Sequence, residues 1–274
     1  MGHLETVTSA NADEALAYLA QRPYDNVYVH WLLASGAIAS GAELVLWRDG
    51  TGSVRGACYY GMQIVVAADE DRATDAFATR LRRGRAGRMI VGPRRTVERF
   101  WRTAQRFMPA PTATRSSQPL YAIERSTLRF TRADATVAPA RLDELDEIVP
   151  NSAQMIAGEV GGDPRRTNAD FRGRTARIVE RGWLWRSRLC GRLVFMCNIG
   201  SQMPQTAQLQ GVWTPPAMRG HGHASRALGA ICDNLLDAWP TLSLYVNAFN
   251  APAVALYERV GFTRAGEFAT ILFA

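Results

Sequence analysis

The sequence contains no lysine, and all 32 of its basic residues are arginine. A genome of high GC content explains this bias, because the chain is rich in alanine as well as arginine. The alternative is that the protein avoids modification of its own lysines. That alternative fails if close relatives with the same activity carry ordinary numbers of surface lysines.

Cysteine and long apolar runs are also scarce. The four cysteines, Cys58, Cys190, Cys197 and Cys232, are scattered and include no CxxC pair. Their spacing argues against a disulfide framework or a cysteine zinc site and is typical of reduced thiols. No apolar run reaches the roughly 18 residues that span a bilayer, and residues 1–16 lack the pattern of a secretory signal. We therefore expect a cytoplasmic protein without membrane attachment.

The formal net charge is +7, and part of it is concentrated in one stretch. Ten arginines lie between Arg80 and Arg106, where Glu98 is the single acid. Such a cluster indicates either a patch for an acidic protein or nucleic acid, or a solvated helix face with its loop. We favour the solvated face because no aromatic stacking motif accompanies the arginines, and nucleic acid is not an expected partner.

A length of 274 residues and a hydrophobic content of 47% suit one large globular domain or two ordinary ones. Residues 108–118, rich in proline, serine and threonine, are expected to form a loop or linker. Periodicity predicts helices at residues 11–20, 26–39, 74–83, 96–107, 141–149, 152–158, 167–181, 224–238 and 251–260, and strands at 43–47, 54–60, 63–68, 88–91, 120–130, 183–188, 193–199, 205–213, 241–246 and 267–273. The two halves follow a similar order, which predicts an internal structural repeat without evident sequence repeat.

The most informative stretch is QLQGVWTPPAMRGHGHASRALGAIC, residues 208–232, which reads as a strand, a glycine-rich loop and a helix. Backbone N–H groups at such a helix start have no partner, and the helix dipole adds positive charge, so a pyrophosphate fits there. The matching stretch of the first half, residues 68–72, is ADEDR and would repel a pyrophosphate. His221 and His223 lack a third ligand nearby, so no metal site is predicted.

Two motifs resemble the GCN5-related N-acetyltransferases (GNAT). RGHGHA at residues 219–224 matches that family's R/Q-x-x-G-x-G/A signature. NAPAVALYERVGF at residues 250–262 is similar to its second motif, an asparagine followed by A-x-x-L-Y-E-x-x-G-F. Both occur in order, each at a strand–helix junction. The resemblance covers roughly residues 136–274, and the first half resembles a degenerate copy, as in bacterial tandem acetyltransferases.

The resemblance implies an α/β fold of tandem GNAT-like domains, each a mixed, mostly antiparallel twisted sheet flanked by helices. Residues 1–130 would form the degenerate N-terminal domain, and residues 131–274 the catalytic domain. A chain of this kind carries one active site. Monomer and homodimer both remain open.

The activity that the resemblance implies is acetyl-CoA-dependent transfer of an acetyl group to a primary amine, by direct attack in a ternary complex. The acceptor is open: a protein lysine, a protein N-terminus, or a small metabolite or antibiotic amine. One alternative is a non-catalytic acyl-CoA-binding or regulatory module. Another is an aminoacyl-tRNA-dependent transferase, against which the intact phosphate loop argues because tRNA needs no such cradle.

The resemblance also implies roles for individual residues. The loop would hold the pyrophosphate, and the strand before it would align the pantetheine arm, which supplies proximity. Asn250 would contact the cofactor, cap its helix, or do both, and Asn247 is a weaker candidate for cofactor or acceptor contact. The implied cofactor-binding residues are Gln210, Val212, Trp213, Arg219, Gly220, His221, Gly222, His223, Ala224, Asn250 and Tyr257.

Two residues are candidates for proton transfer. Tyr257 matches the family's tyrosine that protonates or hydrogen-bonds the leaving thiolate, and a phenol of pKa near 10 is a reasonable donor; the alternative is a packed helix tyrosine. Glu159 could take the amine proton directly or through water, or be an ordinary acid near a helix end. Asp163 is a poorer candidate because it precedes a proline and suits a turn. Water alone could also accept the amine proton.

Overall fold

The computed structural model describes residues 2–81, 87–129 and 136–273. The elements of the N-terminal half are β1 (His3–Thr6), α1 (Ala12–Ala20), α2 (Pro23–Ala34), β2 (Glu43–Arg48), β3 (Val54–Tyr60), β4 (Gln63–Ala68), α3 (Asp71–Arg80), β5 (Met89–Pro93), α4 (Arg94–Ala104), the short helix η2 (Gln105–Phe107) and β6 (Ala113–Glu124). The predicted helix at 74–83 and the predicted strand at 120–130 each extend into residues outside these ranges.

The elements of the C-terminal half follow the same order. They are β7 (Val137–Pro139), η3 (Leu142–Glu144), α5 (Leu145–Val160), α6 (Pro164–Thr167), α7 (Phe171–Glu180), β8 (Leu184–Leu189), β9 (Arg192–Met203), β10 (Thr206–Trp213), η4 (Pro216–Met218), α8 (His223–Leu235), β11 (Thr241–Tyr245), α9 (Ala251–Val260) and β12 (Thr263–Leu272). The order of elements thus repeats between the halves, as the sequence predicted.

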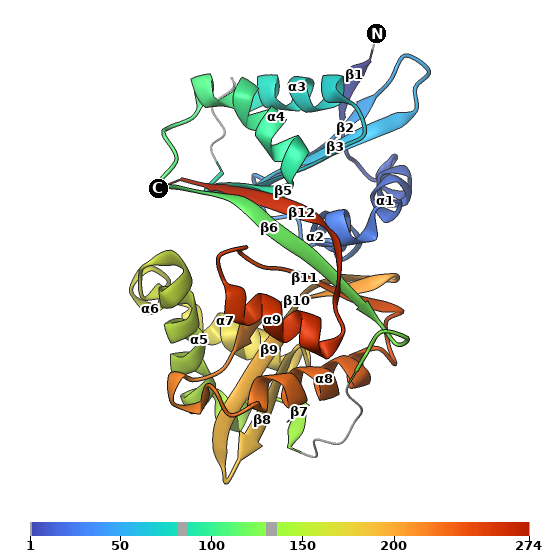
Figure 1. The fold of residues 1–274 in the computed structure, drawn as a ribbon. Helices are drawn as coiled ribbons and strands as arrows, with labels where there is room; N and C mark the ends of the chain where they lie inside the picture. Colours follow the sequence, from blue (N-terminus) through green and yellow to red (C-terminus); the bar gives the residue numbers. More distant parts are fainter. Residues whose placement is uncertain (1, 82–86, 130–135, 274) are drawn as a thin grey trace.

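All twelve strands of the described residues belong to one sheet, ordered β1-β2-β3-β4-β5-β12-β6-β11-β10-β9-β8-β7 (Figure 1). Within it, β4 and β5 run parallel, as do β10 and β11, while the other recorded neighbours are antiparallel. The predicted mixed, mostly antiparallel sheet flanked by helices is confirmed. The two parallel pairs occupy equivalent places in the two halves.

The halves exchange their last strands at the centre of the sheet. β12 lies between β5 and β6, and β6 lies between β12 and β11 (Figure 1). Ile271 of β12 packs in a core with N-terminal residues such as Phe77, and Ile123 of β6 packs in a C-terminal core with Leu228. The predicted boundary between residues 130 and 131 lies outside the described residues, so the division into two domains stays a prediction.

Residues 108–118 were predicted to form a loop or linker, and this is wrong from Ala113 onward. Residues from Ala113 onward form the first half of β6 and pair with β12, for example Arg115 with Thr270 and Gln118 with Phe268. Composition misled here because a strand at the centre of a sheet gains its stability from both neighbours rather than from its own propensity. The strand β1 was also missed.

A second error is the split of α5 into two helices at residues 141–149 and 152–158. Pro150 lies inside the continuous helix. The helix continues through it because Leu145, Ile148, Val149 and Ala153 are buried together against the sheet, and this burial outweighs the lost N–H donor of the proline.

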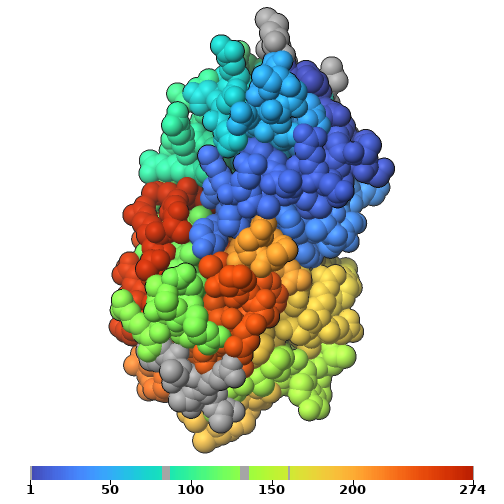
Figure 2. All heavy atoms as spheres, turned by 90° about the vertical axis from the view of Figure 1, so that its right-hand side faces the viewer, coloured from blue at the N-terminus to red at the C-terminus, as the bar shows by residue number. Residues whose placement is uncertain are grey.

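Helices cover both faces of the sheet. α3 and α4 pack on one face of the N-terminal half, and α1 and α2 on the other. In the C-terminal half, α8 and α9 cover one face and α5 and α7 the other. α2 also packs against β9 and β10, and the rings of Trp31 and Trp183 lie 5.6 Å apart. Figure 2 shows N-terminal segments, in blue, directly against a C-terminal segment in orange.

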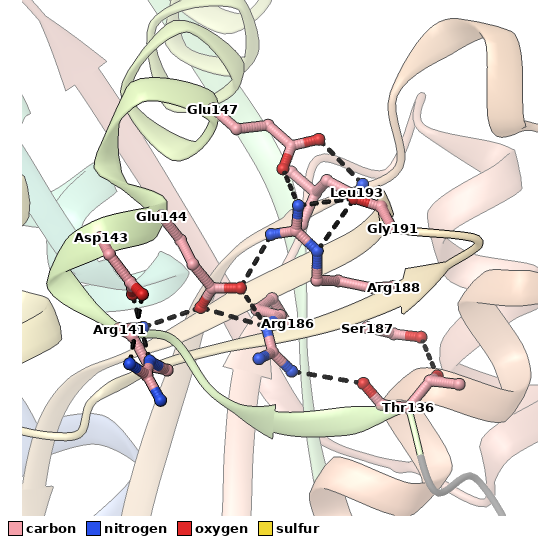
Figure 3. A network of polar contacts seen from close by, with 10 residues as sticks. All are labelled: Thr136, Arg141, Asp143, Glu144, Glu147, Arg186, Ser187, Arg188, Gly191 and Leu193. Carbon is pink, nitrogen blue, oxygen red and sulfur yellow. Dashed lines mark hydrogen bonds and ion pairs between the residues drawn. The ribbon is translucent and has the colours of Figure 1, made fainter.

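A network of ion pairs fixes α5 to strands β8 and β9 (Figure 3). Glu144, with its side chain 11% exposed, accepts hydrogen bonds from Arg186 Nε at 2.9 Å and Arg188 Nη1 at 2.7 Å. Glu147 accepts one from the N–H of Leu193 at 2.9 Å. Burial opposes the charge of Glu144, but the hydrogen bonds from Arg141 N–H and the two guanidiniums outweigh it and hold its pKa below the ordinary value.

The predicted arginine cluster is partly neutralised by acids. Residues 82–86 lie outside the described ranges, but Arg80, Arg94, Arg95 and Arg99 form ion pairs. Their partners are Glu43, Asp71, Asp75, Glu98 and Glu267. No helix within the described ranges is long and apolar enough to cross a membrane.

Candidate functional site

The site forms where two parallel strands separate. β10 and β11 pair only from Thr206 opposite Thr241 to Gln208 opposite Ser243, and then diverge. A hollow of about 1360 Å³ opens there, lined by α5, α6 and α7 on one side and by the start of α8 and by α9 on the other. β6 of the N-terminal half contributes to the wall through Arg115 and Gln118.

A bulge in β10 opens the strand toward the hollow. The register with β9 shifts between Gln210 and Trp213. Gly211 has φ +64°, and a Cβ atom there would lie 2.3 Å from Asn198 Oδ1, so only glycine fits. A bulge leaves backbone groups without strand partners, and those of residues 210–213 are therefore suited to pair with an extended ligand.

The start of α8 forms a second binding surface. Gly222 is its N-cap, with φ +74° and no side chain to satisfy the first N–H groups of the helix. Those groups carry the positive end of the helix dipole. The Arg219 guanidinium adjoins them, held 4.8 Å from the centre of the Trp213 ring and by a 3.1 Å hydrogen bond from Nε to the carbonyl of Thr214. The surface suits a pyrophosphate.

Tyr257 lies on α9 and lines the same hollow as these two surfaces. It is 5% exposed, and its ring packs against Tyr121 and Phe262. Its hydroxyl forms no hydrogen bond recorded among the described residues, although the side chain lines the hollow. Burial, and secondarily the charges of Cys197 and Glu159, raise the pKa of Tyr257. The phenol therefore keeps its proton and can donate it.

Two asparagines follow β11. Asn250 caps α9 by accepting the N–H of Ala253 at 3.3 Å, as the sequence allowed. Asn247 Oδ1 accepts a 3.0 Å hydrogen bond from Gln118 Nε2, and Gln118 Oε1 accepts one of 2.6 Å from Thr270 Oγ1. This chain of bonds fixes the amide of Asn247 with its oxygen occupied, which leaves its Nδ2 as a donor to the hollow.

Glu159 lies near the end of α5 and lines the hollow. Although the side chain is open to the hollow, the surrounding protein displaces water and raises the pKa of its carboxyl, while the Arg115 guanidinium acts in the opposite direction. Arg115 Nη2 also donates a 3.0 Å hydrogen bond to the backbone carbonyl of Glu159. Asp163 instead caps α6 by accepting the N–H of Arg165. Hydrogen bonds from the Arg165 guanidinium and from this N–H lower the pKa of Asp163 to about 2.

The structure brings nearly all the predicted site residues to one hollow. Those that line it are Glu159, Gln210, Val212, Trp213, Arg219, Gly220, Gly222, His223, Ala224, Asn250 and Tyr257. His221 is not among the residues that line it, and its ring is stacked on that of His223 with the centroids 5.9 Å apart. Arg115 and Gln118 were not predicted as site residues, because both fall in the stretch whose composition indicated a loop or linker.

The equivalent place in the N-terminal half is nearly filled. Between the ends of β4 and β5 a space of about 10 Å³ remains, lined by residues that include Tyr18 and Arg22. Arg22 pairs with Asp69 at 3.3 Å across it, and α3 begins with Asp71 after Glu70. Space and charge there both disfavour a pyrophosphate, whereas the C-terminal hollow favours one.

Comparison with protein families identifies the C-terminal half. Residues 161–262 match the acetyltransferase (GNAT) family. The chain belongs to the GNAT superfamily. Membership makes it an acyltransferase that uses acetyl-CoA. In this GNAT protein, residues 42–148 match a second family, described as a domain of unknown function (DUF4081), and no curated protein matches the chain.

Solved structures share the fold of this GNAT chain over nearly its whole length. A GNAT acetyltransferase from Colwellia psychrerythraea has a TM-score of 0.60 at 14% identity, covering 99% of this chain and 100% of its own. A GNAT protein from Sphaerobacter thermophilus gives 0.60 at 14%, covering 98% and 94%. A tandem GNAT protein from the clavulanic acid biosynthesis pathway gives 0.57 at 12%, covering 98% of each chain. These likenesses establish the tandem fold.

Proposed function

We propose that this protein transfers the acetyl group of acetyl-CoA to a primary amine by direct attack in a ternary complex, and that residues 131–274 carry the chemistry. The observation that supports it best is the single hollow that joins the α8 loop, the bulged end of β10, Tyr257 and Glu159. An acetyl donor and an amine need such a shared space to react without a covalent enzyme intermediate.

The residues fit the cofactor in both shape and charge. The uncapped N–H groups after Gly222 and the Arg219 guanidinium would hold the pyrophosphate. The bulged backbone of residues 210–213 would align the pantetheine arm, and Asn250 would contact the cofactor from the start of α9. Acetyl-CoA supplies the acetyl group as a thioester.

Two side chains would move the protons. The amine nitrogen forms a bond to the thioester carbonyl carbon and gives up a proton to Glu159, directly or through water. The carbon–sulfur bond breaks, and Tyr257 donates its proton to the departing thiolate. The raised pKa values of both groups suit these roles, since they keep the phenol protonated and make the carboxylate more basic than usual.

The test is a Tyr257→Phe variant assayed with a panel of amines. We expect kcat to fall about 100-fold, because the acid is lost, while the dissociation constant for acetyl-CoA changes little. Tyr121→Phe is the matched control. It removes a neighbouring phenol whose hydroxyl bonds to Glu258 at 2.9 Å outside the hollow, and we expect it to keep wild-type turnover.

An unchanged kcat in Tyr257→Phe would remove the acid role from this residue. Acetyl-CoA binding without turnover of any amine would contradict the enzyme proposal and favour a binding module.

A further inference from the structure

The arginines that line the hollow differ from those on the outer surface. Of the described residues, four arginines line it, Arg115, Arg174, Arg219 and Arg259, against one acid, Glu159. None of the four has an ion pair with a carboxylate in the described part of the chain, whereas many other arginines do, among them Arg99, Arg165 and Arg188. The hollow is therefore a place of uncompensated positive charge.

The four arginines fall on two sides of the hollow. Arg219 precedes α8 and Arg259 lies on α9, the side of the proposed pyrophosphate site. Arg115 lies on β6 and Arg174 lies on α7. Helix α7 packs against α5, and both helices line the hollow. The phosphates of the cofactor would compensate the first pair. They leave the second pair with Glu159 as its one nearby counter-charge among the described residues that line the hollow.

Arg115 is the best defined of the second pair. It is half-buried, and the one hydrogen bond that its guanidinium makes within the described residues runs from Nη2 to the backbone carbonyl of Glu159. Its charge acts on Tyr245 as well as on Glu159. Removal from water is the main cause of the raised pKa of Tyr245, which Arg115 lowers in part and Glu159 raises further. A guanidinium has five N–H donors in a planar fork. Most of the Arg115 fork thus has no partner among the residues that the structure describes and can bind a carboxylate or phosphate.

A neutral donor supports this charge. The bonds from Thr270 through Gln118 fix the Asn247 amide and leave its Nδ2 free, and Gln118 itself is 2% exposed. Gln118 and Arg115 come from the same strand of the N-terminal half. This strand therefore supplies a cation to the hollow of the C-terminal half and, through Gln118, orients the Asn247 amide that donates there.

We propose that the acceptor is a small amine that also carries an anionic group, a carboxylate or a phosphate, and that Arg115 binds this group while Glu159 faces the amino group. The proposal rests on the acetyl transfer proposed above and names its acceptor class. Polyamines and lysine-rich peptides are disfavoured because they would bring further positive charge to an unpaired guanidinium.

The test compares amines in matched pairs, each anion with its neutral counterpart, at saturating acetyl-CoA. The pairs are glutamate with glutamine, alanine with alaninamide, phosphoethanolamine with ethanolamine, and glucosamine 6-phosphate with glucosamine. We expect kcat/KM to favour the anionic member of at least one pair by 10-fold or more, and the preferred pair distinguishes a carboxylate from a phosphate.

Arg115→Gln is expected to lower kcat/KM for the preferred anionic amine by about 10- to 100-fold, the usual effect of losing a charged hydrogen bond. The neutral member and the affinity for acetyl-CoA should change little. Arg115→Glu should reverse the preference toward neutral or cationic amines. Arg174→Gln should weaken the same preference. Arg172→Gln is the matched control, because this neighbour on α7 pairs with Asp146 outside the hollow.

Equal or better turnover of the neutral amines in every pair would overturn the acceptor proposal and leave acetyl transfer intact. The same follows if Arg115→Gln folds, binds acetyl-CoA and retains the anionic preference. Acetyl-CoA binding without turnover of any amine would instead contradict the proposed function itself.

Discussion

Glu159 and Asp163 lie close in sequence, yet their carboxyl groups meet different surroundings. Asp163 is bound by the N–H and the guanidinium of Arg165, and its pKa is lowered to about 2. Glu159 has no such hydrogen bonds recorded in the described chain, and the pKa of its carboxyl is raised by loss of water. A carboxylate of raised pKa is the better base, so we assign the amine proton to Glu159 as a proposal.

We expect Glu159→Gln to lower kcat/KM about 10- to 100-fold and to change its pH profile. In the wild type, kcat/KM should rise with pH as Glu159 loses its proton, with a midpoint above the ordinary carboxyl value of 4.5 because the pKa is raised. The Glu159→Gln variant should lack this rise of kcat/KM with pH. The measurement is kcat/KM against pH for both proteins.

Asp163→Asn serves as the control and should keep the wild-type profile. If Glu159→Gln also keeps the rise of kcat/KM with pH and the wild-type kcat/KM, the amine proton goes to water instead. The role proposed for Glu159 is then wrong.

At the scale of elements, the walls of the hollow depend on where α5 is anchored. Glu144 joins the start of this helix to Arg186 and Arg188 on β8, while Glu147 accepts the N–H of Leu193 on β9 (Figure 3). These contacts hold the helix whose far end carries Glu159. A shift at the anchor would therefore move the proposed base.

We expect Glu144→Gln to lower the free energy of unfolding by about 2 kcal/mol at pH 7, the scale of lost hydrogen bonds to charged groups. The pKa of Glu144 is lowered in the folded state from 4.5, so its contribution is present above about that pH and is lost as pH falls through the folded pKa. The difference between wild type and variant should therefore narrow in acid. Urea unfolding at several pH values measures it.

Asp143→Asn is the matched control for this anchor. Asp143 pairs with Arg141, and both side chains are well exposed, so we expect little change in stability. A loss as large as that of Glu144→Gln, or a difference that does not narrow in acid, would contradict the account.

At the scale of the whole molecule, each half contributes one strand to the sheet and core of the other half. Phe77 and Ile271 share a core although they come from opposite halves, as do Ile123 and Leu228. Neither half can complete its sheet alone, because β12 and β6 lie between the other's strands. We therefore expect the two halves to unfold together.

Phe77→Ala should reveal this coupling. The side chain is fully buried in the N-terminal half, and its loss should cost about 3–5 kcal/mol. Hydrogen exchange should speed up in peptides from both β3 and β9. Phe249→Ala, at a side chain 80% exposed, is the matched control. It should change neither the free energy of unfolding nor the exchange rate of these peptides. Faster exchange confined to the N-terminal peptides would show that the halves unfold separately.

Much of this protein was predictable from local patterns. The strands at residues 54–60 and 63–68 and the helix at 251–260 have the predicted bounds. The phosphate loop was also visible, because backbone N–H groups and glycine conformations are properties of a short stretch. The acidic character of residues 68–72, the counterpart of this loop in the N-terminal half, was also visible in the sequence. The structure adds that little space for a ligand remains beside these residues.

The sequence by itself thus determined the order of elements, the loop before α8 and the family. Only the tertiary structure decided that β6 and β12 exchange places, and hence that Arg115 and Gln118 reach the hollow around Tyr257. The physical reason is that strand pairing joins residues far apart in the chain through backbone hydrogen bonds that any sequence can form. Composition therefore carries little information about which strands become neighbours.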